Sequence, residues 1–154
     1  TPAFCWYNNN ESDYKVSYGA LYNWNAVNME SICPTGWHVP DDAEWTTLAN
    51  FVGGMGVAGE KLKEAGTAHW LLDESVGTDE NGFTGLPGGF RLMDNFSSAG
   101  SLGLWWSSSE SSSGGLPYSP EESGRHLEMN NSYDYALLGN VLKVNGLSVR
   151  CLKD

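Results

Sequence analysis

Two adjacent tryptophans, Trp105 and Trp106, stand directly before a serine-rich segment that contains Glu110. Adjacent side chains of an extended segment point to opposite faces, so we expect one of the two indoles to be exposed. An exposed indole beside hydroxyls and a carboxylate can stack on a sugar ring and bond its edge. The alternative is an amphipathic strand covered by a neighbouring loop, and the sequence leaves both open.

A second stretch, RHLEMNNSYDY at residues 125–135, has the composition of a recognition surface. Tyr, Ser and Asn are the residues that antibody paratopes favour, because Tyr supplies contact area at a low entropic cost. If the stretch is a strand, one of its faces is polar throughout, and we expect that face to meet solvent. The polar set is His126, Glu128, Asn130, Ser132 and Asp134. Ordinary surface composition explains the same letters almost as well.

The candidate ligand-binding residues come from these two stretches and from the loop between them. They are Trp106, Ser107, Ser109, Glu110, Tyr118, His126, Glu128, Asn130, Tyr133, Asp134 and Tyr135. Together they predict a polar and aromatic face, contributed by residues 105–135, that binds a glycan or another protein without chemistry.

Calcium binding is an open alternative in the loop-rich middle of the chain. Calcium takes several oxygen ligands, which are commonly carboxylates. The acidic residues of this region are Asp73, Glu74, Asp79, Glu80 and Asp94. Because scattered carboxylates more often form a solvated surface, we expect no cofactor, with calcium as the exception to test.

Enzymatic chemistry has little support in the sequence. The histidines His38, His69 and His126 stand beside no evident nucleophile, and no serine follows the pattern of a nucleophile elbow. Cys5 is a candidate reactive thiol, although a lone cysteine is more commonly a small buried hydrophobe. We therefore expect a protein that is not an enzyme.

The cysteines favour a disulfide over a zinc site. Cys5, Cys33 and Cys151 have neither the close pairing nor the adjacent histidine of a zinc site. We expect Cys33 to pair with Cys151, because both follow apolar, element-like stretches and the bond would tie the chain end to the first half. The odd count leaves one thiol over or paired outside the chain, so other pairings stay open.

Composition and charge restrict the class of partner. A chain of 154 residues can bury its own core, and we assign residues 1–154 to a single domain. The net charge of −11 opposes binding to nucleic acid or to an anionic membrane. No apolar run approaches the length of a bilayer span, so we expect no membrane insertion.

Helices are expected in the first half of the chain. Residues 18–28 place apolar side chains at helical spacing, which predicts a short amphipathic helix. Asp41 followed by Glu44 is typical of a capping box and predicts the start of a second helix that ends at Gly53. Residues 57–66 are expected to add a brief helical turn.

The second half is predicted to be mainly β. Residues 102–110 and 125–135 have the patterns of strands, and residues 141–152 alternate well enough for a closing hairpin with Asn145 and Gly146 at its turn. Large aromatic side chains are expected to fill the core that short strands cannot fill alone. The aromatic residues predicted for the core are Trp37, Trp45, Phe83 and Trp105.

These motifs, taken in order, resemble those of a known family. Four segments follow one another as in the Fibrobacter succinogenes major paralogous domain family: CPTGWHVPDDAEW at 33–45, GFTGLPGGFR at 82–91, WWSSSE at 105–110 and LSVRCLKD at 147–154. The resemblance covers nearly the whole chain. It implies an α+β, C-type lectin-like fold in which two short helices flank small twisted antiparallel sheets and long ordered loops form the binding side.

The resemblance also carries expectations about function. It implies an exported bacterial protein, extracellular or on the cell surface, whose relatives include targets of diversity-generating retroelements; residues 104–140 are compatible with such variation. The related formylglycine-generating enzymes use a pair of cysteines late in the chain, where only Cys151 stands here, so that activity is the least favoured alternative. A structural or adhesion spacer within a larger surface protein is the other alternative, and the oligomeric state is left open.

Overall fold

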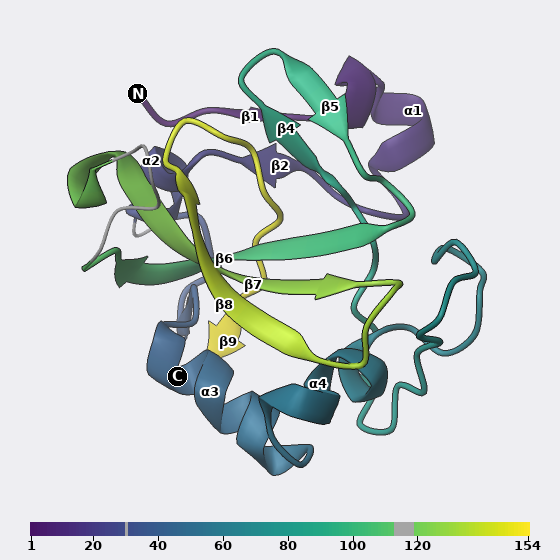
Figure 1. Ribbon diagram of the computed structural model, residues 1–154. Coiled ribbons are helices and arrows are strands. Elements are labelled where there is room, and N and C mark those ends of the chain that lie inside the picture. The colour runs from purple at the N-terminus through teal and green to yellow at the C-terminus, as the bar shows by residue number, and fades with distance from the viewer. Residues whose placement is uncertain (30, 113–118) are drawn as a thin grey trace.

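A three-stranded antiparallel sheet runs through the middle of the molecule in the computed structural model (Figure 1). Its strands are β6 (Leu102–Glu110), β7 (Ser123–Asn130) and β8 (Ala136–Leu142), and β7 lies between the other two. The structure describes residues 1–29, 31–112 and 119–154, so the predicted site residue Tyr118 lies outside the described residues. The strand predicted at residues 102–110 is confirmed, whereas the strand predicted at 125–135 ends at Asn130.

Short antiparallel pairs of strands surround this sheet. They are β1 (Phe4–Cys5) with β2 (Leu21–Tyr22), β3 (Trp37–His38) with β9 (Leu152–Lys153), and β4 (Phe90–Leu92) with β5 (Asn95–Ser97). The α+β class with small antiparallel sheets is therefore confirmed.

The helix predicted after Asp41 is present as α3 (Asp42–Phe51), and its capping box is complete. The carboxylate of Asp41 accepts a hydrogen bond from the backbone N–H of Glu44 at 2.8 Å, and Glu44 accepts one from the N–H of Asp41 at 2.9 Å. Two of the free N–H groups at the helix start thereby gain hydrogen-bond acceptors. The helix start predicted from Asp41 and Glu44 is therefore present in the folded chain.

The remaining helical segments are short. α4 (Met55–Leu62) begins two residues before the turn predicted at 57–66. It also ends earlier than predicted, because the backbone is already extended at Lys63. The others are α1 (Glu11–Tyr14), α2 (Trp24–Val27) and the 3-10 helices η1 (Tyr7–Asn9) and η2 (Pro120–Glu122).

The single helix predicted for residues 18–28 is wrong. Gly19 adopts a positive φ of 72°, after which the chain forms β2 against β1 and then the single turn α2. Asn23 starts that turn, since its side-chain oxygen accepts a hydrogen bond from the N–H of Ala26. The apolar spacing that indicated one helix is divided between a strand and a helical turn.

The closing hairpin predicted for residues 141–152 is also wrong. After β8 the chain turns at Lys143 and Val144 and runs back towards β9 along an irregular path (Figure 1). Along this path Leu147 pairs with Tyr22 and Ser148 pairs with Trp105. The alternating pattern was therefore satisfied by contacts with distant segments.

Both faces of the central sheet are covered by apolar cores. On one face Trp105, Leu127 and Met129 pack in a cluster with side chains from α3 and α4, which include Trp45 and Leu62. Phe83 packs, partly buried, against this cluster. These contacts account for the first core, and they confirm the core positions predicted for Trp45 and Trp105.

On the other face Leu104 and Trp106 pack with Trp24, Val27 and Leu147. The exposed fractions of Trp105 and Trp106 are 4% and 0%, so the expectation that one indole is exposed is wrong. The indoles do point to opposite faces, but each face has a core of its own.

Trp37 is not in the core, contrary to prediction. Its exposed fraction is 42%, because it lies in the two-residue strand β3, which pairs with the equally short strand β9. A short strand at the rim leaves one side of the indole without a covering layer.

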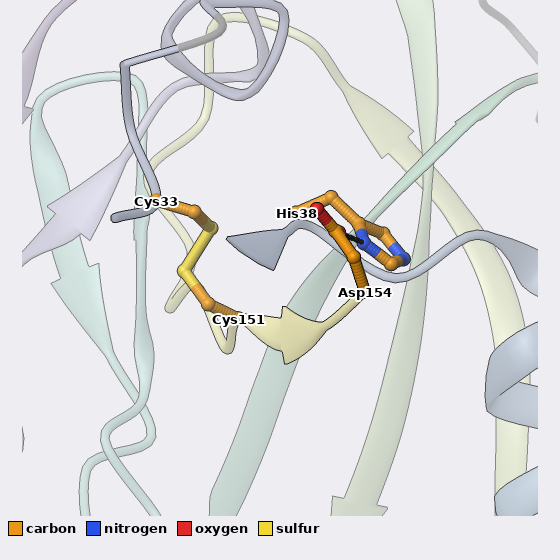
Figure 2. The surroundings of a disulfide bond; sticks show 4 residues. All are labelled: Cys33, His38, Cys151 and Asp154. Atoms are coloured by element: carbon orange, nitrogen blue, oxygen red, sulfur yellow. Dashed lines mark hydrogen bonds and ion pairs between the residues drawn. A yellow bond between two sulfur atoms is a disulfide. The ribbon is translucent and has the colours of Figure 1, made fainter. Parts of the chain in front are cut away.

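The disulfide between Cys33 and Cys151 is confirmed and joins residues 118 positions apart (Figure 2). Beside it, His38 uses both ring nitrogens, with Nδ1 2.6 Å from Asp154 and Nε2 2.9 Å from Glu44. The hydrogen bonds to Asp154 and then Glu44 raise the pKa of His38, so the imidazolium form is favoured. Cys5 is a half-buried free thiol.

Removal of the disulfide should lower the free energy of unfolding by about 4 kcal/mol, because closure of so long a loop restricts the unfolded chain. The measurement is urea unfolding of the double variant Cys33→Ala/Cys151→Ala beside the oxidised wild type. Cys5→Ala is the matched control and should change the midpoint far less. A double variant as stable as the wild type would contradict the tie between the chain end and the first half.

Candidate functional site

Several residues predicted to form the binding face lie inside the molecule. Trp106, Ser107 and His126 are buried. The indole Nε1 of Trp106 donates to the backbone oxygen of Tyr22 at 2.6 Å. Their predicted exposure is therefore wrong, because the second core covers the sheet face to which Trp106 and His126 belong.

The serines after the tryptophan pair anchor α3 to the sheet. Ser107 Oγ donates to one carboxylate oxygen of Asp42 at 2.6 Å, and the other oxygen accepts Nε of Arg125 at 2.6 Å. Ser109 Oγ accepts a hydrogen bond from the backbone N–H of Asp42 at 2.9 Å. These polar groups satisfy one another, so they stabilise the fold and offer few free bonds to a ligand.

Three further predicted residues are separate from one another in their contacts. Glu110 is exposed and lies 3.6 Å from Lys143. Glu128 is half-buried with a carboxylate oxygen 3.7 Å from His126, and Asn130 accepts a hydrogen bond from a backbone N–H of the following turn. These side chains do not form one recognition face with the buried residues of β6.

The last three predicted residues, Tyr133, Asp134 and Tyr135, do lie together at the surface. They belong to the segment between β7 and β8, residues 131–135, which we call the tyrosine turn. The rings of Tyr133 and Tyr135 stack with centroids 4.7 Å apart and planes 14° apart. Their exposed fractions are 47% and 39%, so the stacked pair is accessible from solvent.

A loop from which the sequence offered only Asp73 and Glu74, as possible calcium ligands, is bonded to the tyrosine turn. In this segment, residues 71–77, the backbone oxygen of Leu71 accepts a hydrogen bond from Asn131 Nδ2 at 3.1 Å. The hydroxyl of Ser132 donates to Asp73 at 2.7 Å, and the hydroxyl of Ser75 donates to Asp134 at 2.5 Å. The 71–77 loop and the tyrosine turn thus form one connected surface.

The buried ammonium of Lys63 holds these two segments from beneath. Its Nζ donates to the backbone oxygens of Asn130, Ser75 and Tyr133 at 2.8, 3.0 and 3.2 Å, and to the hydroxyl of Ser75 at 2.7 Å. Lys63 is fully buried, with an exposed fraction of 0%. A buried cation is tolerated only where acceptors surround it, and here those acceptors come from the 71–77 loop, the tyrosine turn and the last residue of β7.

The electrostatics of Lys63 reflect this position. Burial lowers the pKa of its ammonium from 10.5 to about 8, while the nearby carboxylates of Asp134 and Glu60 act in the opposite direction. The protonated form therefore predominates at neutral pH. No motif marked Lys63 in the sequence, because its acceptors are backbone oxygens that distant segments supply.

Helix α4 approaches the tyrosine turn at Gly59. A Cβ at this position would lie 2.8 Å from the backbone oxygen of Asp134 and still closer to that of Tyr135. The next residue, Glu60, donates its backbone N–H to the oxygen of Asp134 at 2.9 Å. The absence of a side chain at Gly59 therefore sets how closely the turn can pack on α4.

The groups considered for catalysis and metal binding are engaged elsewhere. His69 lies 2.8 Å from Glu64, much as His38 and His126 lie beside carboxylates. The carboxylate of Asp79 accepts two hydrogen bonds from Thr84, both at 2.7 Å. Within the described ranges, no three acidic, histidine or cysteine side chains gather closely enough to hold a metal ion.

Comparison with known families decides the assignment of the chain. The profile of the Fibrobacter succinogenes major domain matches residues 1–153. The chain belongs to this family. A search of the curated proteins found no match, and a search of the solved structures found none either.

For this Fibrobacter succinogenes major domain, the surface built on the tyrosine turn is the best candidate site among the described residues. In the same described part, no helix is long and apolar enough to cross a bilayer.

Two glycines of α4 offer a matched test of how the helix supports the turn. Gly59→Ala should lower the free energy of unfolding by about 1–3 kcal/mol, since the new Cβ meets backbone that has to move. Gly56→Ala, which meets nothing within 4 Å, should raise it by about 0.5–1 kcal/mol through helix propensity. Urea unfolding measures both. Equal effects of the two substitutions would show that α4 does not contact the turn in this way.

Proposed function

We propose that this domain is a ligand-binding module that recognises its partner through the tyrosine turn and the 71–77 loop, and that it catalyses no reaction. The observation that carries the proposal is the stacked and exposed pair Tyr133 and Tyr135, held by hydrogen bonds from Lys63 and the loop. A surface that is rigid before binding loses little conformational entropy when it binds, which favours recognition.

The side chains around the pair indicate the kind of ligand. Leu71 and Leu72 are exposed on the 71–77 loop, and Asp73 and Glu74 follow them directly. Apolar and tyrosine side chains together are typical of the centre of a protein interface. The carboxylates favour a partner that is neutral or basic there. We therefore place a protein ligand first.

A glycan is the second candidate. In the stacked pair, each tyrosine ring turns one face towards its partner and the other face away from it. Such aromatic faces pack on the apolar faces of sugars. Asp134 is exposed between the two tyrosines in sequence and can accept hydrogen bonds from hydroxyls. Binding through these groups requires no metal, so we propose that neither ligand class depends on calcium.

The setting of the module is part of the same proposal. The small antiparallel sheets and long loops support a C-type lectin-like fold, and the Cys33–Cys151 disulfide supports export to an oxidising compartment, outside the cell or on its surface. The turn is a run of Asn, Ser, Tyr and Asp in which Tyr133, Asp134 and Tyr135 are exposed, and this composition supports the idea of a retroelement-diversified surface. A spacer within a larger surface protein is the alternative, and it predicts no ligand.

Binding tests use the purified domain against a displayed peptide library and a glycan array, each with calcium and again with chelator. Ligands selected by the wild type should bind Tyr133→Ala/Tyr135→Ala at least about tenfold more weakly, because exposed aromatic anchors dominate such interfaces. They should bind equally with chelator present. Phe51→Ala removes an exposed aromatic residue from α3 and is the matched control, expected to bind like the wild type.

Two results would overturn the proposal. One is a selected ligand that binds the double tyrosine variant as tightly as the wild type. The other is no binding to either collection by a folded sample with its disulfide intact, which would favour the spacer. Binding of sugars alone would decide the ligand class in favour of the glycan.

A further inference from the structure

A cavity of about 330 Å³ opens beside the disulfide and shares no residue with the tyrosine turn. Its walls come from α3, from the turn at residues 81–83 and from the last segment of the chain. The side chains that define it are Glu44, Trp45, Leu48, Phe83 and Arg150. A volume of this size lies in the range of small-molecule sites, and its lining is mainly apolar.

Arg150 is the cation among the residues of this wall. Its guanidinium carbon lies 4.5 Å from the ring centroid of Phe83, and Nη2 donates to the backbone oxygen of Phe83. Among the described residues it forms no ion pair, and its Nε and Nη1 groups make no hydrogen bond. Asp79 acts on Arg150 electrostatically, and each of its carboxylate oxygens accepts a hydrogen bond from Thr84.

Trp45 lines the same wall, and its indole N–H is buried. Its indole is 2% exposed, yet Nε1 has no hydrogen-bond acceptor in the part of the chain that the structure describes. Because Nε1 itself is buried, it lies behind the cavity surface, and Trp45 contributes its apolar ring to the wall.

The carboxylate of Glu44, the acidic side chain of the wall, already has hydrogen-bond partners. Both carboxylate oxygens of Glu44 lie within 3.0 Å of the His38 ring, and one of them accepts the backbone N–H of Asp41. The raised pKa of His38, caused first by its hydrogen bond to Asp154 and then by that to Glu44, favours the imidazolium, which lies between these two carboxylates. Glu44 is therefore engaged by its neighbours, and Arg150 is the cation among the lining residues.

We propose that this cavity binds a small organic carboxylate whose anionic group takes the free N–H groups of Arg150 and whose apolar body packs on Trp45, Leu48 and Phe83. The planar guanidinium matches a carboxylate with two parallel hydrogen bonds, and the apolar walls exclude competing water. The same chemistry is present in a free aromatic acid and in the C-terminal carboxylate of a peptide. This site does not depend on the function proposed for the tyrosine turn.

The probes are benzoate, with benzamide as its uncharged counterpart, titrated into ¹⁵N-labelled protein with its disulfide intact. Benzoate should shift the indole N–H signal of Trp45 and bind in the millimolar range, as expected for a ligand of so few atoms. Benzamide should shift this signal much less. N-acetylphenylalanine and its amide form a second pair, and tighter binding of that acid than of benzoate would assign the source as a peptide C-terminus.

Variants of the wall decide the role of Arg150. Arg150→Lys keeps the charge but loses the paired hydrogen bonds, so it should weaken benzoate at least about tenfold. Leu48→Phe narrows the cavity and should weaken benzoate while Arg150 is intact, whereas Asp94→Asn, remote from the wall, should have no effect. The spectrum of each variant reports whether it is folded. Equal binding of benzoate and benzamide, no shift at Trp45, or unchanged binding by folded Arg150→Lys would overturn the proposal.

Discussion

The burial of β6 on both faces is the constraint on which the rest of the molecule depends. Trp105 and Trp106 point to opposite sides of one strand, and each fills a core of its own. Because a three-stranded sheet has few side chains per face, these two indoles supply much of the apolar mass that joins it to its covering layers. β6 is consequently buried on both faces, whereas the turn that joins β7 to β8 is exposed at Tyr133, Asp134 and Tyr135.

Much of the fold could be predicted where the signal is local. The capping box of Asp41 and Glu44 needs only residues within one turn, and the strand at residues 102–110 has a clear pattern of its own. The disulfide was also predicted correctly. By contrast, the segments at 18–28 and 141–152 take their structure from distant partners, so their local patterns indicated the wrong elements.

The candidate site was predictable in part for the same reason. Composition pointed to Tyr133, Asp134 and Tyr135, and the end of β7 at Asn130 places them in an exposed turn. The same composition pointed to His126 in the strand, which the second core buries. Alternation along a strand shows which residues share a face, but not whether another layer covers that face.

Lys63 is the element that no sequence pattern revealed and that the site most requires. Its ammonium donates the hydrogen bonds that water would otherwise give to backbone oxygens in segments that lack regular structure. Lys63 thereby joins two loops into one surface. The tyrosine turn is thus held from below by Lys63, and the close approach of α4 at Gly59 is its second support.

The most direct measurement of that claim is amide hydrogen exchange in the wild type and in Lys63→Met. In the wild type the amides of Ser75 and Asn131, which donate to Asn131 and Ser101, should be protected. In Lys63→Met their exchange should become at least about tenfold faster, while the amide of Leu127 in β7 stays protected. Unprotected turn amides in the wild type, or unchanged exchange in the folded variant, would contradict a platform held by Lys63.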